Sequence, residues 1–148
     1  MGNAQANVEK AIQEIKKING VSVIKVASLY LTKAWGLTDQ QDFINTAVSL
    51  NTKLTAIELL NAFQNIENKM GRVRHEKWGP RVIDIDILLY SDFVVNQQRL
   101  TIPHPYILER NFVIVPLLEL NQEVSVPNKG KLCDLVSNIE INRDILII

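Results

Sequence analysis

The stretch that decides the fold reads Val-Ile-Asp-Ile-Asp-Ile-Leu-Leu-Tyr and covers residues 82–90. Successive side chains of a β-strand point to opposite faces. One face would therefore be wholly aliphatic, with Ile83, Ile85, Ile87 and Leu89, and the other would carry Asp84 and Asp86. This alternation predicts a β-strand with one core face and one acidic face.

The sequence before this strand predicts two helices and two more strands. Apolar residues at helical spacing over residues 8–18 predict a helix that stops at Asn19-Gly20. Residues 21–32 have the β-branched and aromatic composition of a strand, and residues 43–51 alternate as a second strand does. A capping box at residues 55–58 opens the second helix, which ends at Gly71. Its apolar stripe consists of Leu59, Leu60, Phe63, Ile66 and Met70.

The remaining sequence predicts a hairpin over residues 93–102, a helical segment interrupted by Pro116 and a short helix over residues 132–139. The expected order is α-β-β-α-β with a C-terminal tail, in a single domain over residues 1–148. A strand in front of the first helix would complete the βαββαβ order of split-βαβ folds. We therefore expect this first strand to be missing from the chain.

Composition narrows the class of protein. Sixteen Lys and Arg balance sixteen Asp and Glu among 148 residues, so no global charge favours nucleic acid or an anionic membrane. The single cysteine, Cys133, cannot form an intrachain disulfide, and no zinc spacing occurs. No apolar run reaches the ~20 residues of a membrane helix, and the first residues lack a signal-peptide core. We expect a cytoplasmic protein.

The two acids of the acidic face are candidate metal ligands. Residues two apart on a strand project from the same face, roughly 6 to 7 Å apart, and carboxylate oxygens suit Mg²⁺. The alternative, two acids simply facing water, is the commoner meaning of a bare Asp-x-Asp. Upstream, however, five cations occur within thirteen residues: Lys69, Arg72, Arg74, Lys77 and Arg81. A basic loop that leads into an acidic strand indicates a polyphosphate–Mg²⁺ site, unless the charges form only a solvated run.

Aromatic and amide side chains suggest a second ligand. Trp35 and Trp78 lie in the two long loops, where each could cover a planar ligand or anchor its loop. Phe43 and Asn45 share the strand face opposite the core set, and this pair suits a flat heterocycle with donors and acceptors. A packing pair with a surface amide is the alternative. Gln64 and Glu67 share one face of the second helix, which leads to the basic loop.

One block of sequence carries a specific resemblance. Gly-Arg-Val-Arg at residues 71–74, followed by Lys-Trp-Gly-Pro-Arg-Val-Ile-Asp-Ile-Asp-Ile-Leu at residues 77–88, resembles the signature of the 6-hydroxymethyl-7,8-dihydropterin pyrophosphokinase family of folate biosynthesis. Supporting matches extend from Asn7 to Phe112, nearly the whole chain.

This resemblance implies an α+β fold, a ferredoxin-like αβ sandwich with an antiparallel-dominated sheet, helices on one face and a C-terminal extension. It implies transfer of the β,γ-diphosphate of ATP to the pterin hydroxymethyl group, with AMP as the other product and two Mg²⁺ held by Asp84 and Asp86. The implied catalytic residues are Arg72, Arg81, Asp84 and Asp86. The implied ATP-binding residues are Gln64, Arg74, Ile87, Arg99, Thr101, His104 and Arg110. The implied pterin-binding residues are Thr32, Trp35, Phe43, Asn45, Trp78 and Phe112.

The sequence departs from the family pattern in three places. Family members begin with a strand ending in Gly-Ser-Asn, and this sequence starts directly after it. The loop between Arg74 and Trp78 is one residue shorter than in some relatives, which leaves the contacts of His75 and Lys77 open. Pro105 stands where some relatives have an aromatic residue. We expect a monomer that binds ATP and the pterin, with no nucleic-acid or membrane partner.

Two other readings compete with the enzyme. A ferredoxin-like RNA-binding module would display stacking aromatics on its sheet, but the zero net charge and the exposed acids speak against it. A catalytically inactive relative that retains the fold is the third possibility.

Overall fold

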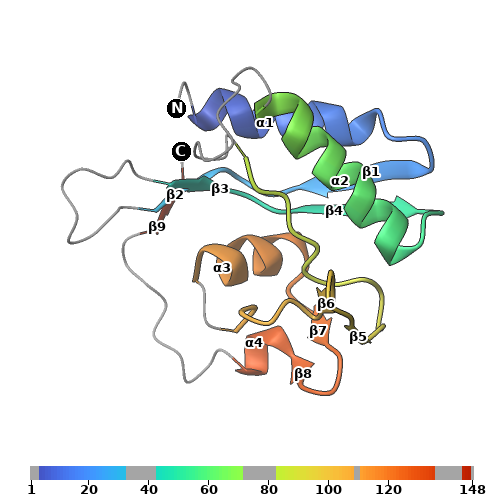
Figure 1. The fold of residues 1–148 in the computed structure, drawn as a ribbon. Helices are drawn as coiled ribbons and strands as arrows, with labels where there is room; N and C mark the ends of the chain where they lie inside the picture. The colour runs from blue at the N-terminus through green and yellow to red at the C-terminus, as the bar shows by residue number, and fades with distance from the viewer. Residues whose placement is uncertain (1–3, 33–42, 72–82, 109–110, 136–144, 148) are drawn as a thin grey trace.

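The computed structural model describes residues 4–32, 43–71, 83–108, 111–135 and 145–147. Helices α1 (Ala4–Lys16) and α2 (Ala56–Gly71) lie side by side on one face of the strands, and α3 (Asn111–Leu120) lies on the other face (Figure 1). The strand pairs are antiparallel. The expected α+β class is therefore confirmed, whereas the expected placement of helices on one face holds only for α1 and α2.

Each of the two predicted strands is split by a short break. The first gives β1 (Val21–Val26) and β2 (Tyr30–Thr32), and the second gives β3 (Phe43–Asn45) and β4 (Val48–Thr52). β1 pairs with β4 and β2 pairs with β3. The breaks face each other: the Ala27 N–H donates to the Ala47 carbonyl at 2.9 Å, and the Thr46 hydroxyl donates to the Ala27 carbonyl at 3.0 Å. The predicted strands thus form one antiparallel pair with a common kink.

A third strand joins this sheet from the end of the chain. β9 (Ile145–Ile147) pairs antiparallel with β2, so that the order is β3-β2-β9. The sequence predicts only a C-terminal tail for residues 145–147, so the strand and its pairing differ from that expectation.

Both helices agree closely with the sequence pattern. The Thr55 hydroxyl accepts the Glu58 N–H at 3.2 Å, and the Glu58 carboxylate accepts the Thr55 N–H at 2.8 Å, which is the expected capping box. The buried residues of α2 are the predicted stripe, Leu59, Leu60, Phe63, Ile66 and Met70. After α1, Gly20 has φ +84°, a left-handed conformation that favours glycine.

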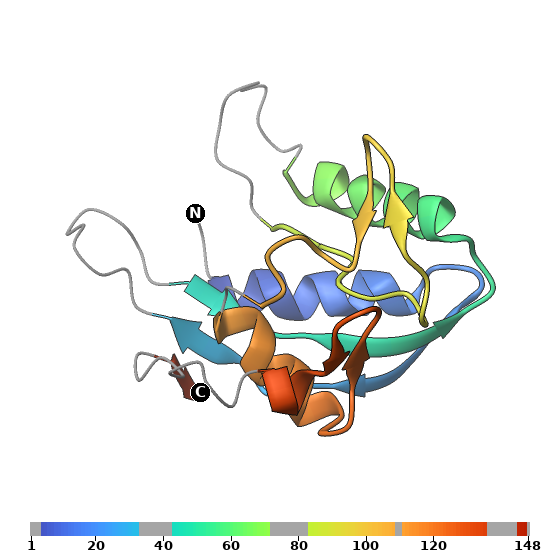
Figure 2. The ribbon, with the colours of Figure 1, turned by 90° about the horizontal axis from the view of Figure 1, so that it is seen from below.

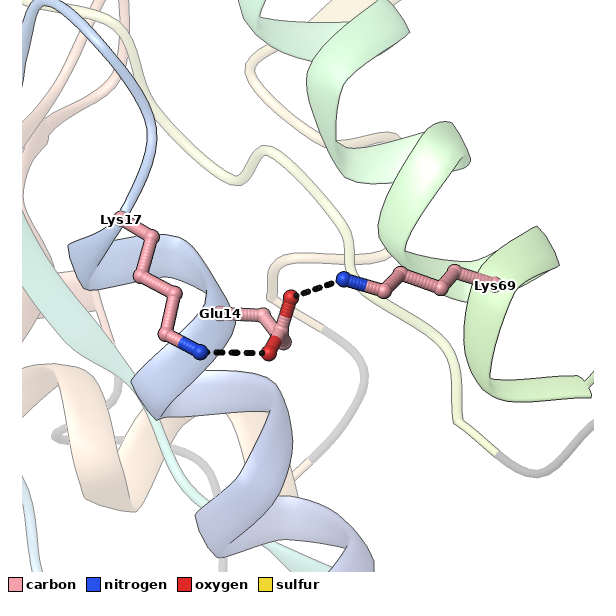
Figure 3. A network of polar contacts seen from close by, with 3 residues as sticks. All are labelled: Glu14, Lys17 and Lys69. Carbon is pink, nitrogen blue, oxygen red and sulfur yellow. Dashed lines mark hydrogen bonds and ion pairs between the residues drawn. The ribbon is translucent and has the colours of Figure 1, made fainter.

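An exposed ion-pair network joins the two helices. Glu14 on α1 binds Lys69 of α2 at 3.0 Å and Lys17 at 3.2 Å (Figure 3). These hydrogen bonds, chiefly the one from Lys69, lower the pKa of Glu14. Lys69, the first cation of the basic run, is therefore engaged with α1.

The prediction of a β-strand over residues 82–90 is wrong for its described part, since residues 83–90 form no strand. The alternation nevertheless persists over residues 83–87. It ends there, because Leu88 and Leu89 both pack against a second apolar cluster, so Leu89 does not share the predicted core face of the isoleucines. Ile83, Ile85 and Ile87 pack into the core formed by α1 and α2, and Asp84 and Asp86 are exposed. An extended segment needs a neighbouring backbone to become a ladder, and β4, within the described residues, pairs only with β1. The alternation of side chains in this segment was therefore predictable from sequence. The absence of backbone pairing in its described part was not.

The C-terminal half forms a second apolar cluster around Ile114, Leu117 and Leu132. The predicted hairpin is present as β5 (Val95–Asn96) and β6 (Thr101–Ile102), and α3 contains Pro116 as expected. A further hairpin, β7 (Ser125–Val126) with β8 (Gly130–Lys131), was not predicted. Helix α4 (Leu132–Leu135) begins as predicted, while residues 136–139 lie outside the described residues. Figure 2 shows both hairpins from below. In the described ranges no helix is long and apolar enough to cross a bilayer.

Candidate active site

The acidic pair lies on the solvent side of residues 83–90, as the sequence predicts. Asp84 and Asp86 are exposed, and the isoleucines that alternate with them point into the core. Asp86 Oδ2 lies 3.9 Å from His104 Nε2. This arrangement leaves carboxylate oxygens accessible to a cation and to solvent. Whether the pair shares a side with Phe43 and Asn45 stays a prediction.

Two contacts position the acidic segment. The Glu67 carboxylate on α2 accepts the Ile85 N–H at 2.6 Å, directly between the two acids. The Leu88 carbonyl accepts the His104 N–H at 2.9 Å. Glu67, which the sequence placed on the site face of α2, therefore holds the backbone that presents Asp84 and Asp86.

His104 is oriented by its own loop. Its Nδ1 accepts the Tyr106 backbone N–H at 3.1 Å, so the neutral ring carries its proton on Nε2, toward Asp86. The ring is partly buried, with 17% of the side chain exposed. The structure thus places His104 beside Asp86. Its role in binding ATP stays a prediction.

Arg99 binds α2 through neutral groups. Its Nη2 donates to Asn61 Oδ1 at 2.6 Å and to Gln64 Oε1 at 3.0 Å. Both acceptors are neutral amide oxygens, so neither forms an ion pair with the guanidinium. The structure brings together two predicted ATP-binding residues, Arg99 and Gln64. Asn61 was not singled out from the sequence, although its place one helical turn before Gln64 was a usable signal.

Ile87 and Thr101 differ in what they offer a nucleotide. Thr101 is exposed on β6. Ile87 is only 7% exposed and lies in the core. A role of Ile87 in ATP binding is therefore limited to its backbone.

The candidate pterin residues that the structure describes lie on three elements: Thr32 is on β2, Phe43 and Asn45 are on β3, and Phe112 is on α3. Phe43 pairs with Thr32, and Asn45 pairs with Tyr30 of β2. Phe43 is 55% exposed and Asn45 is half-buried. An exposed ring beside a half-buried amide supplies a stacking surface and a hydrogen-bonding edge. Phe112, also half-buried, lies in the first turn of α3.

Several predicted site residues lie outside the described residues. They are Trp35, Arg72, Arg74, Trp78, Arg81 and Arg110, together with His75 and Lys77 of the same basic loop.

The carboxylates of Asp84 and Asp86 fit one mode of Mg²⁺ binding. Among the described residues, no group of three or more His, Cys, Asp and Glu could enclose a metal ion. Mg²⁺ commonly binds through one or two carboxylates and completes its octahedron with water and substrate phosphates. Two exposed acids suit that mode and do not suit an all-protein cage.

One polar cluster was missed by the sequence analysis. Glu119 on α3 accepts hydrogen bonds from Ser28 and from the Tyr30 hydroxyl. The usable signal was that Glu119 is the only charged residue in Asn-Phe-Val-Ile-Val-Pro-Leu-Leu-Glu-Leu. A carboxylate in such a helix needs a partner.

Known proteins resemble this chain over most of its length. The 7,8-dihydro-6-hydroxymethylpterin-pyrophosphokinase family matches residues 1–122. The 2-amino-4-hydroxy-6-hydroxymethyldihydropteridine pyrophosphokinase of Haemophilus influenzae is 39% identical over 126 residues, 85% of this chain and 79% of that protein. The proteins of the same name from Synechocystis and Bacillus subtilis are 42% and 40% identical, over 88% and 84% of this chain and 67% and 74% of their own lengths. By the extent of these matches, the chain belongs to the 7,8-dihydro-6-hydroxymethylpterin-pyrophosphokinase family.

Proposed function

We propose that this chain transfers the β,γ-diphosphate of ATP to the hydroxyl of 6-hydroxymethyl-7,8-dihydropterin, which gives the pterin diphosphate and AMP in folate biosynthesis. The observation that carries the proposal is the exposed Asp84–Asp86 pair, held by Glu67 and His104, in a chain of this family.

The proposed nucleotide site lies between the acidic segment and the hairpin β5–β6. Asp84 and Asp86 would hold two Mg²⁺, which supply charge stabilisation for the phosphates. Arg99, tied to α2 by amides, offers its charge to the same anion. We assign Arg72, Arg74, Arg81 and Arg110 to the phosphates as well, with Gln64, Thr101, His104 and the backbone of Ile87 at the nucleotide.

The proposed pterin slot has Asn45 at its edge and aromatic rings at its faces. Asn45 offers an amide that can both donate to and accept from the pterin edge. Phe43 and Phe112 supply stacking surfaces, and we assign Thr32, Trp35 and Trp78 to the same slot.

The chemistry asks the protein mainly to position its substrates. The nucleophile is the substrate's own hydroxyl, so no Ser–His or Cys–His pair is needed. The arginines and the acidic site keep the phosphates in line with that hydroxyl and balance the charge on AMP as it leaves. Exclusion of water by the surrounding chain would suppress hydrolysis of ATP.

We also propose that the sheet of this ferredoxin-like fold accommodates one more strand, between β4 and residues 83–90. Residues 83–87 have the parity of a strand without a ladder, and β4 is paired within the described residues only with β1. An apolar strand ending in Gly-Ser-Asn, added before Met1, should raise the melting temperature and the activity together. An addition that changes neither would contradict this topology.

One assay tests the function. Purified protein is incubated with ATP, Mg²⁺ and 6-hydroxymethyl-7,8-dihydropterin, and AMP is measured with and without the pterin. We expect AMP to form only when the pterin is present, and from one 148-residue domain acting as a monomer. AMP formation that is independent of the pterin, or ADP as the product, would refute the proposal.

A further inference from the structure

The Glu119 carboxylate joins α3 to the strands on the face opposite α1 and α2. Glu119 Oε2 accepts the Ser28 N–H at 2.9 Å and the Ser28 hydroxyl at 3.0 Å, and Oε1 accepts the Tyr30 hydroxyl. Nearby, Lys25 Nζ donates to the Leu120 carbonyl at 3.3 Å. Three donors from one short segment of chain therefore converge on a single side chain of α3.

The charges of this cluster are fixed at neutral pH. The hydrogen bonds from Tyr30 and Ser28 lower the pKa of Glu119, with that from Tyr30 as the largest cause. Burial, and then the bond to Glu119, raise the pKa of Tyr30 to about 12. Glu119 is thus a carboxylate and Tyr30 a neutral phenol, which is the charge-assisted form of this hydrogen bond.

Both ends of the cluster lead to the proposed pterin slot. Tyr30 is the cross-strand partner of Asn45. Glu119 is seven residues after Phe112 on α3, and residues seven apart lie on nearly the same helix face, about 10 Å along the axis. The cluster therefore connects the strand beside Asn45 to the helix that carries Phe112.

Resting on the proposed function, we infer that Glu119 is a positioning residue for the pterin: its bonds to Ser28 and Tyr30 set the separation between Asn45 and Phe112. It touches neither substrate in this arrangement. The nucleotide groups Asp86, His104 and Arg99 are held by other contacts, through Glu67, Leu88 and α2. Loss of Glu119 should then act on pterin binding and leave ATP binding largely unchanged.

The variants to compare are Glu119→Ala, Glu119→Gln and Tyr30→Phe. Alanine removes the acceptor for all three donors. Glu119→Gln keeps one acceptor oxygen, and Tyr30→Phe removes only one donor. Both substitutions disturb the cluster less than Glu119→Ala does. They therefore keep the test valid if the alanine variant fails to fold. Glu123→Ala is the matched control. Glu123 is an exposed carboxylate that follows α3 in the sequence, and it pairs with Lys131 rather than with Ser28 or Tyr30.

The readouts are KM for the pterin, KM for ATP, kcat and the melting temperature. For Glu119→Ala we expect the pterin KM to rise about tenfold or more while the ATP KM changes less than about twofold. Glu119→Gln and Tyr30→Phe should give smaller rises in the same direction, and Glu123→Ala should match the wild type. Two results would overturn this inference without affecting the proposed function. One is an equal change in both KM values, and the other is a lower melting temperature with both KM values unchanged. A wild-type protein without pterin-dependent AMP formation would overturn the proposed function itself.

Discussion

Substitution of Asp86 should lower activity with little effect on stability. The Asp86 side chain is 57% exposed and approaches His104 at 3.9 Å, a contact that contributes little to stability. Asp86→Ala should lower Mg²⁺-dependent AMP formation by about 100-fold or more, since the metal supplies several kcal/mol of charge stabilisation. The unfolding free energy should change by less than about 0.5 kcal/mol.

Asp92→Ala provides the control for this experiment, because Asp92 is another exposed acid six residues further along the chain. It should retain wild-type turnover. Wild-type turnover by Asp86→Ala would remove Asp86 from the metal site.

Asn45 should discriminate between the two substrates. A polar pterin edge left unpaired in a dry slot costs about 1 to 3 kcal/mol, so Asn45→Ala should weaken pterin binding roughly 5- to 150-fold and leave ATP binding nearly unchanged. Calorimetric titration with each ligand measures this. Asn51→Ala, an exposed amide on β4, is the control. Equal weakening of both ligands by Asn45→Ala would contradict the assigned role.

Among the elements, α2 matters most because it carries both Gln64 and Glu67. Its N-terminus depends on the reciprocal bonds of Thr55 and Glu58, and loss of such a cap costs about 0.5 to 2 kcal/mol. Thr55→Ala should lower the unfolding free energy in urea by that amount with an unchanged m-value. Ser22→Ala, at an exposed position of β1, should change it by less than about 0.5 kcal/mol. A Thr55→Ala protein as stable as the wild type would show that tertiary packing alone fixes the start of α2.

Elements with local signals were predictable from sequence, and long-range pairings were not. The stripe of α2 and the parity of residues 83–87 depend only on helical or strand period, and both agree with the structure. The pairing of β9 with β2 joins residues more than a hundred positions apart, and no local pattern encodes it. For the site, residue types marked Asp84, Asp86 and His104, whereas Asn61 and Glu119 gain their roles only from contacts made by folding.

For the whole molecule, the Tyr30–Glu119 pair predicts how stability depends on pH. The folded pKa of Tyr30 is raised from 10.0 to about 12, so its contribution is complete below pH 10 and is lost between about pH 10 and 12. The folded pKa of Glu119 is lowered from 4.5, so its contribution is present above that value and is lost as the pH falls below it. The unfolding free energy should therefore fall at both acid and alkaline pH, and this one contact should contribute to both decreases.

The measurement is the urea unfolding free energy of wild type and Tyr30→Phe across the pH range. Their difference should be constant between about pH 4.5 and 10 and shrink toward pH 12. It should also shrink as the pH falls below 4.5, because the Tyr30 hydroxyl is the main cause of the lowered pKa of Glu119. Tyr106→Phe removes an exposed tyrosine and should show no such trend. A difference that stays constant up to pH 12 would mean that Tyr30 titrates alike in the folded and unfolded chain.

The extended segment that carries the acids has a consequence for hydrogen exchange. Within the described residues, the Ile85 amide is held by Glu67, and the amides of residues 86–89 take part in no ladder. In deuterium oxide, the amides of residues 86–89 should exchange about ten times faster or more than those of Ser22 and Asn51, which face each other in the β1–β4 ladder. Binding of a strand to this segment would slow that exchange, whereas a cation at the carboxylates alone would not. Hydrogen exchange thus distinguishes pairing of the backbone of this segment from binding of a cation to its carboxylates.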